Sequence, residues 1–486
     1  MTATPDVGLG ISTAVGIARA IRTGAVTAAE VVDNAIARVG ATDDTLHAFV
    51  ERTDELARSQ ATAVDAAIAR GEQPGPLAGV PIAIKDLIAT AGVPTRNGSV
   101  AYANWVPEED DIVVERVKQA GAVILGKTTV PEFGYSGVGH NPISPVARNP
   151  WNPALTPGGS SAGSAVAVAA GMSPVALGSD GGGSVRIPAS LCGLVGFKPS
   201  MGRIPLYPGC RDERYPGVSS WETLEHIGPI TRTVADAALL MSVLAGPDAR
   251  DRHSLPAGDV DWLEIVGGGA PQSLAGIRIA YAPDLGYLPV DPEVRTVVAQ
   301  AVTAFDDLGA SVVEVDPGID DSRAYVWTQV MADTDLAGMR RMVAEHGDRM
   351  SPHLVELIER PWTAEEFTDA QMVRKRVVNQ MWKFMADYDL LLTPTLSVPA
   401  FPIGMQGPEL IDGQMVDAGS WLGFLNIFNM TGQPAMSVPA GFTDDGLPVG
   451  LQIVGPHLGD AAVLRAAACF ERVRPWHDRW PDIPGS

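Results

Sequence analysis

The chain has 486 residues, and its apolar content of 46% and charged content of 19% are those of a globular protein, which excludes a disordered or fibrous chain. The net charge of −22 repels polyphosphates and anionic lipid surfaces, so nucleic-acid binding and membrane-surface binding are excluded as main tasks. Three cysteines with no Cys-x-x-Cys pair and no zinc-type cluster exclude a disulfide framework and favour a reducing compartment, so we expect a cytoplasmic protein.

Helical patterns dominate the first 70 residues. Apolar residues spaced three and four apart predict a helix over 27–39, with a capping-box pair at its start. An alanine-rich stretch predicts a second helix over 47–70. The apolar run 80–84 then predicts a short buried strand, which ends at Lys85.

Helices and strands alternate along the rest of the chain. This alternation predicts an α/β fold in which a large, mixed and mostly buried sheet is wrapped by helices. No fixed-period repeat and no Ser/Gly linker divides the chain, so we expect one domain over 1–486, with the charged helical stretch 320–370 as a peripheral insertion. Helices are predicted over 111–120, 164–170, 233–245, 292–308 and 369–388, and strands over 122–125, 174–177, 277–281, 311–315 and 389–393.

Two short patterns imitate known motifs without their structural context. Residues 121–128 match the nucleotide-binding P-loop pattern, but the four residues between the glycines are themselves the predicted strand. Residues 159–163 match the Gly-x-Ser-x-Gly elbow of the α/β-hydrolases. That elbow must follow a hydrophobic strand, whereas here a proline-rich loop precedes it. We therefore assign neither function.

The segment 156–184 is rich in glycine and serine and also contains apolar stretches that a flexible linker would lack. Three glycines, 181–183, lie between Asp180 and Ser184. Such a run allows successive backbone N–H groups to converge on one point, where they would stabilise a developing oxyanion. Ser184 stands where a nucleophile would be expected.

A serine nucleophile needs a base, and no histidine occurs between residues 141 and 225. A distant histidine could still fold into the site. Lys85 is the better candidate, because it lies between apolar residues and a desolvated lysine can be neutral near pH 7. A lysine that reaches solvent from a strand end is the ordinary alternative.

The chain resembles the amidase signature family. The resemblance extends to about Pro456 and so covers nearly the whole chain. The matching segments are GVPIAIKD (79–86), GKTTVPEF (126–133), NPWNPALTPGGSSAGSAVAVAAG (149–171), GSDGGGSVRIPASLCGLVGFKPSMGRI (178–204), DLLLTPT (389–395), TGQPAMSVP (431–439) and GLPVGLQIVGP (446–456).

The resemblance implies a catalytic triad and a single compact α/β domain. Ser184 corresponds to the nucleophile, Ser160 to a bridging serine that follows a cis peptide bond, and Lys85 to the base. The backbone N–H groups of Gly181, Gly182, Gly183 and Ser184 correspond to the oxyanion hole, and Ser161, Asp180 and Arg186 to supporting residues. This chemistry needs neither a metal nor an organic cofactor. Gly181 departs from the family, whose members usually carry a larger residue there, so this loop has more conformational freedom.

We therefore expect an amidase that hydrolyses a small-molecule carboxamide through an acyl-serine intermediate. Aromatic residues at Tyr135, Tyr207, Trp327 and Phe428 are expected to line the pocket and to favour neutral aryl or aliphatic acyl groups. An aryl acylamidase, an esterase and a carbamate (urethane) hydrolase remain open on the same triad. So do the glutamine-hydrolysing component of a tRNA-dependent amidotransferase and a non-catalytic binding module. The oligomeric state is also open, with a homodimer as one candidate.

Overall fold

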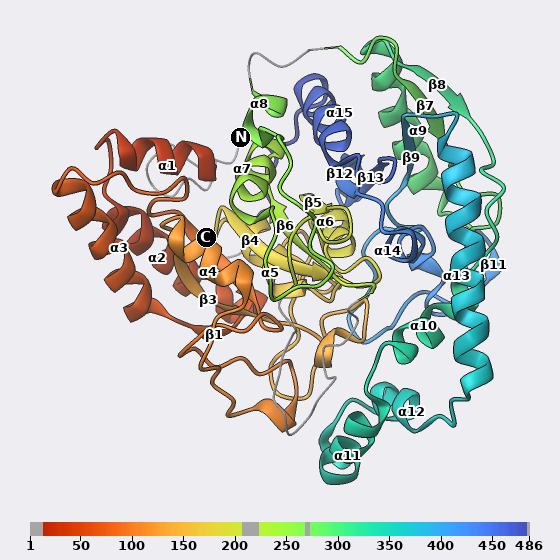
Figure 1. The fold of residues 1–486 in the computed structure, drawn as a ribbon, viewed down its shortest axis with the longest axis horizontal. Helices are drawn as coiled ribbons and strands as arrows, with labels where there is room; N and C mark the ends of the chain where they lie inside the picture. Colours follow the sequence, from red (N-terminus) through yellow and green to blue (C-terminus); the bar gives the residue numbers. More distant parts are fainter. Residues whose placement is uncertain (1–12, 207–222, 268–272, 484–486) are drawn as a thin grey trace.

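A mixed sheet of eleven strands runs across the middle of the computed structural model, which describes residues 13–206, 223–267 and 273–483 (Figure 1). The strands are β1 (Phe49–Arg52), β2 (Pro81–Lys85), β3 (Val123–Thr128), β4 (Val175–Asp180), β5 (Val195–Lys198), β6 (His226–Thr231), β7 (Arg278–Tyr281), β8 (Ser311–Glu314), β9 (Leu390–Pro394), β12 (Ala435–Phe442) and β13 (Pro448–Val454). Their order in the sheet is β1-β3-β2-β4-β6-β5-β12-β13-β9-β7-β8. Strand β2 is parallel to β3 and β4, and β7 is parallel to β8 and β9, whereas the remaining neighbours are antiparallel. The strands β10 (Leu410–Ile411) and β11 (Gln414–Met415) form a separate hairpin.

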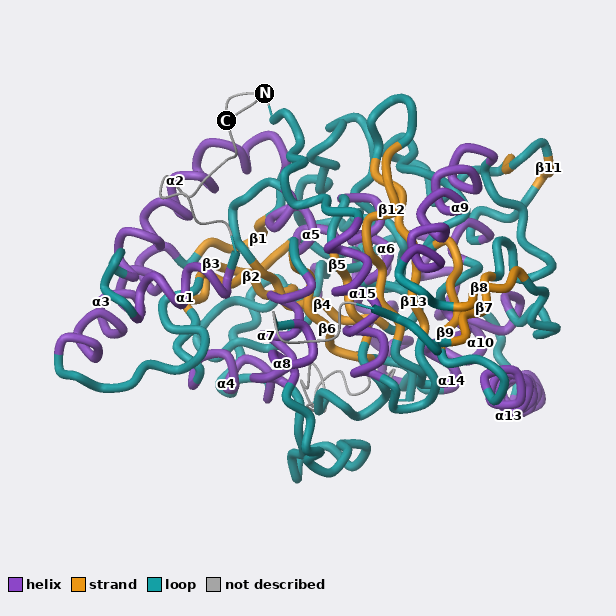
Figure 2. Tube along the Cα trace, turned by 90° about the horizontal axis from the view of Figure 1, so that it is seen from above, coloured by secondary structure: helices purple, strands orange, loops and turns teal. Residues whose placement is uncertain are grey.

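Helices lie on both sides of the band of strands, which confirms the predicted α/β architecture (Figure 2). They are α1 (Ala14–Arg22), α2 (Ala28–Leu46), α3 (Asp54–Ala69), α4 (Ile112–Gln119), α5 (Ala162–Ala169), α6 (Arg186–Cys192), α7 (Val234–Leu244), α8 (Trp262–Val266), α9 (Pro292–Asp307), α10 (Val326–Ala332), α11 (Leu336–His346), α12 (Pro352–Glu359), α13 (Ala364–Met385), α14 (Asn426–Thr431) and α15 (Asp460–Val473). Figure 1 shows α1–α3 at one end of the molecule and α13 at the other. In the described part of the chain, no helix combines the length and the apolar character that crossing a bilayer requires.

Most of the predicted elements are present, and the clearest error lies at residues 47–53. The helix predicted over 47–70 is instead a strand, β1, followed by α3. Strand β1 pairs antiparallel with β3, and the Thr53 backbone N–H also donates to Leu125 O. These tertiary hydrogen bonds override the local helical pattern. The capping box predicted at the start of the helix over 27–39 is present between Thr27 and Glu30, at the N-terminus of α2.

The two motif-like segments have the ordinary structures that the sequence favoured. Residues 123–128 are strand β3, so no phosphate-binding turn precedes Lys127. The Lys127 ammonium is buried and donates to the Ile88 carbonyl at 2.7 Å and to Thr95 Oγ1 at 2.6 Å. No strand directly precedes Gly159. Neither segment has the geometry of the motif that it imitates.

The charged segment 320–370 forms α10, α11, α12 and the start of α13. Its apolar side chains pack into the main core, among them the fully or almost fully buried Met331, Met339 and Leu354. Ser351 N donates to the buried Glu132 carboxylate at 2.6 Å. The segment is therefore attached to the loop that follows β3.

Candidate active site

Lys85 ends strand β2, and its side chain is completely buried. Its Nζ lies 2.7 Å from Ser160 Oγ, 2.9 Å from Ser179 Oγ and 3.1 Å from the Ser179 carbonyl oxygen. Strand β4 carries Ser179 next to β2, so the parallel pairing of the two strands brings these groups together. The sheet therefore encloses the lysine and directs it at a serine.

Burial lowers the pKa of Lys85 and the negative charges of Glu225 and Asp180 raise it, and together they place this pKa at about 7. Removing an ammonium from water disfavours its charged form, and two nearby carboxylates favour it. The balance gives Lys85 a substantial neutral fraction at physiological pH. The alternative that this lysine reaches solvent is excluded by its burial.

Ser160 follows a cis peptide bond from Gly159, as the family resemblance implied. Its neighbour Ser161 is the N-cap residue of α5 and connects two turns of the site. Ser161 Oγ donates to the Ser179 carbonyl at 3.2 Å, and Ser161 N donates to the Ser184 carbonyl at 3.2 Å. Ser161 thus ties the turn that carries Ser160 to the turn that carries Ser184.

Ser184 lies between strand β4 and helix α6 and is 6% exposed. Among the described residues its hydroxyl makes no hydrogen bond. The structure therefore contains the Lys85–Ser160 contact, whereas the Ser160–Ser184 contact of the expected triad is not made as a hydrogen bond. Catalytic hydrogen bonds often tighten only when substrate binds.

The glycine turn 181–183 differs in one respect from the expected oxyanion hole. The Gly183 N–H donates to Asp180 Oδ1 at 2.7 Å, so it is not available to a substrate oxygen. The backbone N–H groups of Gly181, Gly182 and Ser184 donate to no described group. Gly183 has a φ of +120° and approaches Leu425 closely, so its role in this turn is conformational.

Asp180 and Arg186 form a fully buried ion pair beneath this turn. The guanidinium binds both carboxylate oxygens at 2.9 Å, and the Arg186 charge holds the pKa of Asp180 below its usual range. Arg186 also donates to Gln452 Oε1 at 2.8 Å and to Asn429 Oδ1 at 2.7 Å. These bonds fix the turn between strand β13 and helix α14.

The predicted pocket residues are only partly brought together. Tyr135 follows Gly134, where an added Cβ would lie 3.2 Å from Ser160 Oγ. The Tyr135 and Trp327 rings stack with centroids 6.2 Å apart, and Trp327 is 41% exposed. Phe428 is fully buried in the main core, and Tyr207 lies outside the described residues.

Sequence reasoning missed three polar groups of this site. Ser179 accepts hydrogen bonds from Lys85, Asn429 binds the Asp180 turn, and Glu225 acts electrostatically on Lys85. Ser179 could have been found, because it directly precedes Asp180 in the glycine-rich segment. Asn429 and Glu225 lie far along the chain, and no local pattern connects them to the site.

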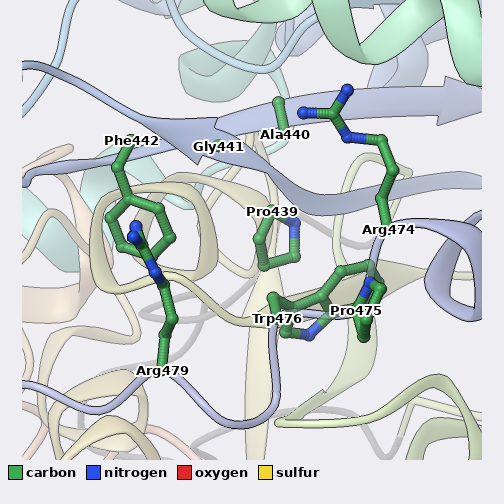
Figure 3. A pocket seen from close by; sticks show the side chains of 8 residues that line it. All are labelled: Pro439, Ala440, Gly441, Phe442, Arg474, Pro475, Trp476 and Arg479. Carbon is green, nitrogen blue, oxygen red and sulfur yellow. The ribbon is translucent and has the colours of Figure 1, made fainter. Parts of the chain in front are cut away.

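A separate hollow lies at the far end of α6. It is lined by Pro439, Ala440, Gly441, Phe442, Arg474, Pro475, Trp476 and Arg479 (Figure 3). The Arg479 guanidinium lies 4.4 Å from the centroid of the Phe442 ring. Phe442 pairs with Pro448, and a Cβ added at Gly193, the C-cap residue of α6, would lie 3.2 Å from Pro448, whereas Ser184 precedes the N-terminus of that helix. The hollow is thus distinct from the site of Ser184.

No cluster of metal-binding side chains is found in residues 13–206, 223–267 and 273–483, where no three His, Cys, Asp or Glu residues lie together in a suitable arrangement. Cys192 and Cys469 are buried, and both carry thiols rather than a disulfide.

The chain is similar to known proteins along nearly its whole length. The model of the family described as Amidase matches residues 30–464. An acylamidase of Rhodococcus erythropolis is 39% identical over 469 residues, which cover 93% of each chain. A glutamyl-tRNA(Gln) amidotransferase component of Chloroflexus aurantiacus is 34% identical over 491 residues, covering 96% of this chain and 97% of that protein. The crystal structure of a bacterial aryl acylamidase of the amidase signature family superposes with a TM-score of 0.88 at 33% identity and 98% coverage of both chains.

Proposed function

The chain belongs to the amidase family, whose members hydrolyse amide C–N bonds, and from this premise we propose that Ser184, Ser160 and Lys85 cleave neutral aryl or aliphatic amides. The observation that carries the proposal is the 2.7 Å contact between Lys85 Nζ and Ser160 Oγ in a fully buried setting. No part of the proposed reaction requires a metal or an organic cofactor.

The three contacts of Lys85 suit a neutral amine. A neutral amine has two N–H donors, which the two Ser179 oxygens accept, and one lone pair, which then faces the Ser160 hydroxyl. Lys85 accepts the Ser160 proton, and Ser160 accepts the Ser184 proton, while Ser184 Oγ forms a bond to the carbonyl carbon. The carbonyl π electrons move to oxygen, and the amides of Gly181, Gly182 and Ser184 stabilise the resulting oxyanion.

The tetrahedral intermediate collapses when the oxyanion reforms the carbonyl and the C–N bond breaks. The leaving nitrogen takes a proton from Ser160, which regains one from the Lys85 ammonium, so that an amine departs and an acyl-serine remains. Water then attacks the ester, giving its proton to Lys85 through Ser160, and Ser184 leaves with that proton as the free hydroxyl. The product is a carboxylic acid, and the enzyme returns to its initial state.

The aromatic pair of Tyr135 and Trp327 supports an aryl or aliphatic substrate. Gly134 lies beside Ser160, and the next residue, Tyr135, stacks on Trp327. The Trp327 ring is partly exposed. Such a surface binds flat apolar groups. The 39% identity to an acylamidase agrees with this substrate class. Esters and carbamates would undergo the same acyl-serine chemistry.

Glutamine hydrolysis within a tRNA-dependent amidotransferase is the second candidate, and the 34% identity to a component of such an enzyme supports it. That role would require partner proteins. In the first role, the enzyme acts on a small molecule, either alone or as a homodimer. It does so in the cytoplasm, a compartment that the sparse cysteines favour.

Comparing two substrates on the purified chain tests the proposal. We expect a higher kcat/KM for 4-nitroacetanilide than for glutamine, and we expect Ser184→Ala to abolish both turnover and labelling by a fluorophosphonate. Near-normal turnover by Ser184→Ala would refute the mechanism. A tenfold preference for glutamine, or activity only with added amidotransferase partners, would establish the second candidate.

A further inference from the structure

Glu225 directly precedes strand β6 and is 9% exposed. In the antiparallel pairing of β4 with β6, Ser179 faces Ile227 and Asp180 faces His226. Side chains two residues apart lie on the same face of a strand, so the register directs Glu225 to the face that carries Ser179. That is the face on which Lys85 donates to Ser179 Oγ.

The backbone around Glu225 is held firmly against the active-site turn. The Leu224 carbonyl accepts a hydrogen bond from Asn429 Nδ2 at 3.2 Å, and the His226 ring nitrogen Nδ1 lies 2.8 Å from the same oxygen. Asn429 Nδ2 also donates to the Asp180 carbonyl at 2.7 Å. One amide group therefore joins the segment 224–226 to the turn that precedes Ser184.

Glu225 interacts electrostatically with two buried titratable groups, Lys85 and Asp111. Lys85 interacts electrostatically with Glu225 and with Asp180. The Asp180 charge is offset by Arg186 and Lys198. On the other side, burial and the Glu225 charge together raise the pKa of Asp111 to about 7, against the opposing charges of Arg250 and Lys127. Glu225 thus lies within electrostatic reach of both Lys85 and Asp111.

We propose that Glu225 is a positioning residue that controls the protonation of Lys85 from behind the triad, without touching the substrate. The proposal rests on the proposed function of Lys85 as the base. A negative carboxylate favours the ammonium form of the lysine. Glu225 therefore keeps Lys85 a strong enough base to deprotonate Ser160, and a carboxylate there delays the appearance of the neutral form until higher pH.

Removing the Glu225 charge shifts the pKa of Lys85 in a definite direction. Without the Glu225 carboxylate the pKa of Lys85 falls, so the neutral amine exists at lower pH and the acid limb of the reaction shifts to lower pH. The pKa of Lys85, about 7, already includes the raising effect of the Glu225 charge, so the loss of that charge lowers the pKa further. The charge of Asp180 remains in every variant, whereas the loss of Glu225 also removes its effect on the pKa of Asp111.

The test is the pH dependence of fluorophosphonate labelling, which reports the activation of Ser184 without a leaving amine. In that reaction Ser184 Oγ forms a bond to phosphorus, the P–F bond breaks, fluoride leaves with the bonding pair, and the serine proton passes through Ser160 to Lys85. Second-order labelling rates are measured from pH 5 to pH 10 for wild type, Glu225→Gln, Glu225→Ala and the charge-conserving Glu225→Asp, with thermal unfolding to verify the fold.

We expect both neutral variants to shift the midpoint of the acid limb down by about one pH unit, which raises the labelling rate near pH 6, relative to its own plateau, up to about tenfold. Glu225→Asp should retain the wild-type midpoint. An unshifted midpoint in the folded Gln or Ala variant would overturn the proposal, as would an equal shift in Glu225→Asp. Absence of Ser184 labelling in wild type at every pH would instead refute the proposed function itself.

Discussion

Ser179 supplies two of the three oxygen atoms within hydrogen-bond distance of Lys85 Nζ, its hydroxyl at 2.9 Å and its carbonyl at 3.1 Å. The backbone of Ser179 is held in turn, because Ser179 pairs with Ile227 of β6. A lysine on a flexible stem loses the direction of its lone pair when one of these acceptors is removed. The orientation of Lys85, the proposed base, therefore depends on a residue outside the proposed triad.

We predict that Ser179→Ala lowers kcat by about tenfold, which corresponds to about 1.4 kcal/mol for one lost hydrogen bond. KM should change little, since Ser179 lies behind Lys85. The matched control is Ser173→Ala, which removes another buried serine near β4 that donates to the carbonyls of Pro81 and Val175. Steady-state kinetics on 4-nitroacetanilide compare the two variants, and an equal loss of kcat in both would contradict a specific role for Ser179.

Among single residues, the sequence singled out as candidates those groups that stand in unusual local patterns. Lys85 sits at the end of an apolar run and Ser184 follows three glycines, and both patterns have a direct chemical meaning. The expectation for Gly183 was wrong, because the Asp180 carboxylate captures its N–H. Residue type cannot reveal which of four adjacent amides a neighbouring carboxylate will bind.

Helix α5 shows how closely the elements approach one another around the site. An added Cβ on Gly163 would lie 2.1 Å from the Ala48 carbonyl oxygen and 2.4 Å from Thr129 N. Both are backbone atoms and neither can move without disturbing β1 or the end of β3. The first turn of α5 directly follows Ser160 and Ser161. It therefore packs closely against the start of β1 and the end of β3.

We expect Gly163→Ala to reduce the free energy of unfolding by about 1–3 kcal/mol through overpacking, and to lower activity by displacing the Ser160 turn. Gly40→Ala is the control, because Gly40 lies exposed in α2 with nothing within 4 Å of the added Cβ. That substitution should stabilise the chain by about 0.5–1 kcal/mol. Denaturant unfolding measures both. If Gly163→Ala were as stable as wild type, the predicted close approach would be wrong.

Three helices with clear periodicity, predicted over 111–120, 233–245 and 292–308, match α4, α7 and α9 to within one residue at each end, whereas α2, predicted over 27–39, extends to Leu46. The strand β9, predicted over 389–393 and found at Leu390–Pro394, shows that short apolar runs also suffice when they are flanked by polar residues. Strand β1 was missed, since its identity depends on pairing with β3, which lies far along the chain. Its sequence FVER shows no alternation strong enough to oppose the alanine-rich helix that follows.

The charge of the whole molecule bears on which substrates reach the site. With a net charge of −22, the molecule surrounds itself with a negative potential that repels anions. Near Ser184 the described cations are already engaged: Arg186 pairs with Asp180, and Lys85 is buried behind Ser160. Neither is positioned to receive a substrate carboxylate. This arrangement favours neutral amides over anionic ones for reasons independent of the aromatic pair.

We therefore predict that salt separates two anilides that differ in one carboxylate. For the anionic succinyl-4-nitroanilide, kcat/KM should rise several-fold between 10 mM and 500 mM NaCl, because the screening length falls from about 30 Å to about 4 Å and the repulsion disappears. For the neutral 4-nitroacetanilide, which feels no net force from the protein, kcat/KM should stay within about twofold over the same range. The neutral compound also controls for effects of salt on the chemical step, which both substrates share. A fall in kcat/KM for the anionic anilide on addition of salt would mean that a cation at the site attracts its carboxylate, and the expected preference for neutral substrates would then be wrong.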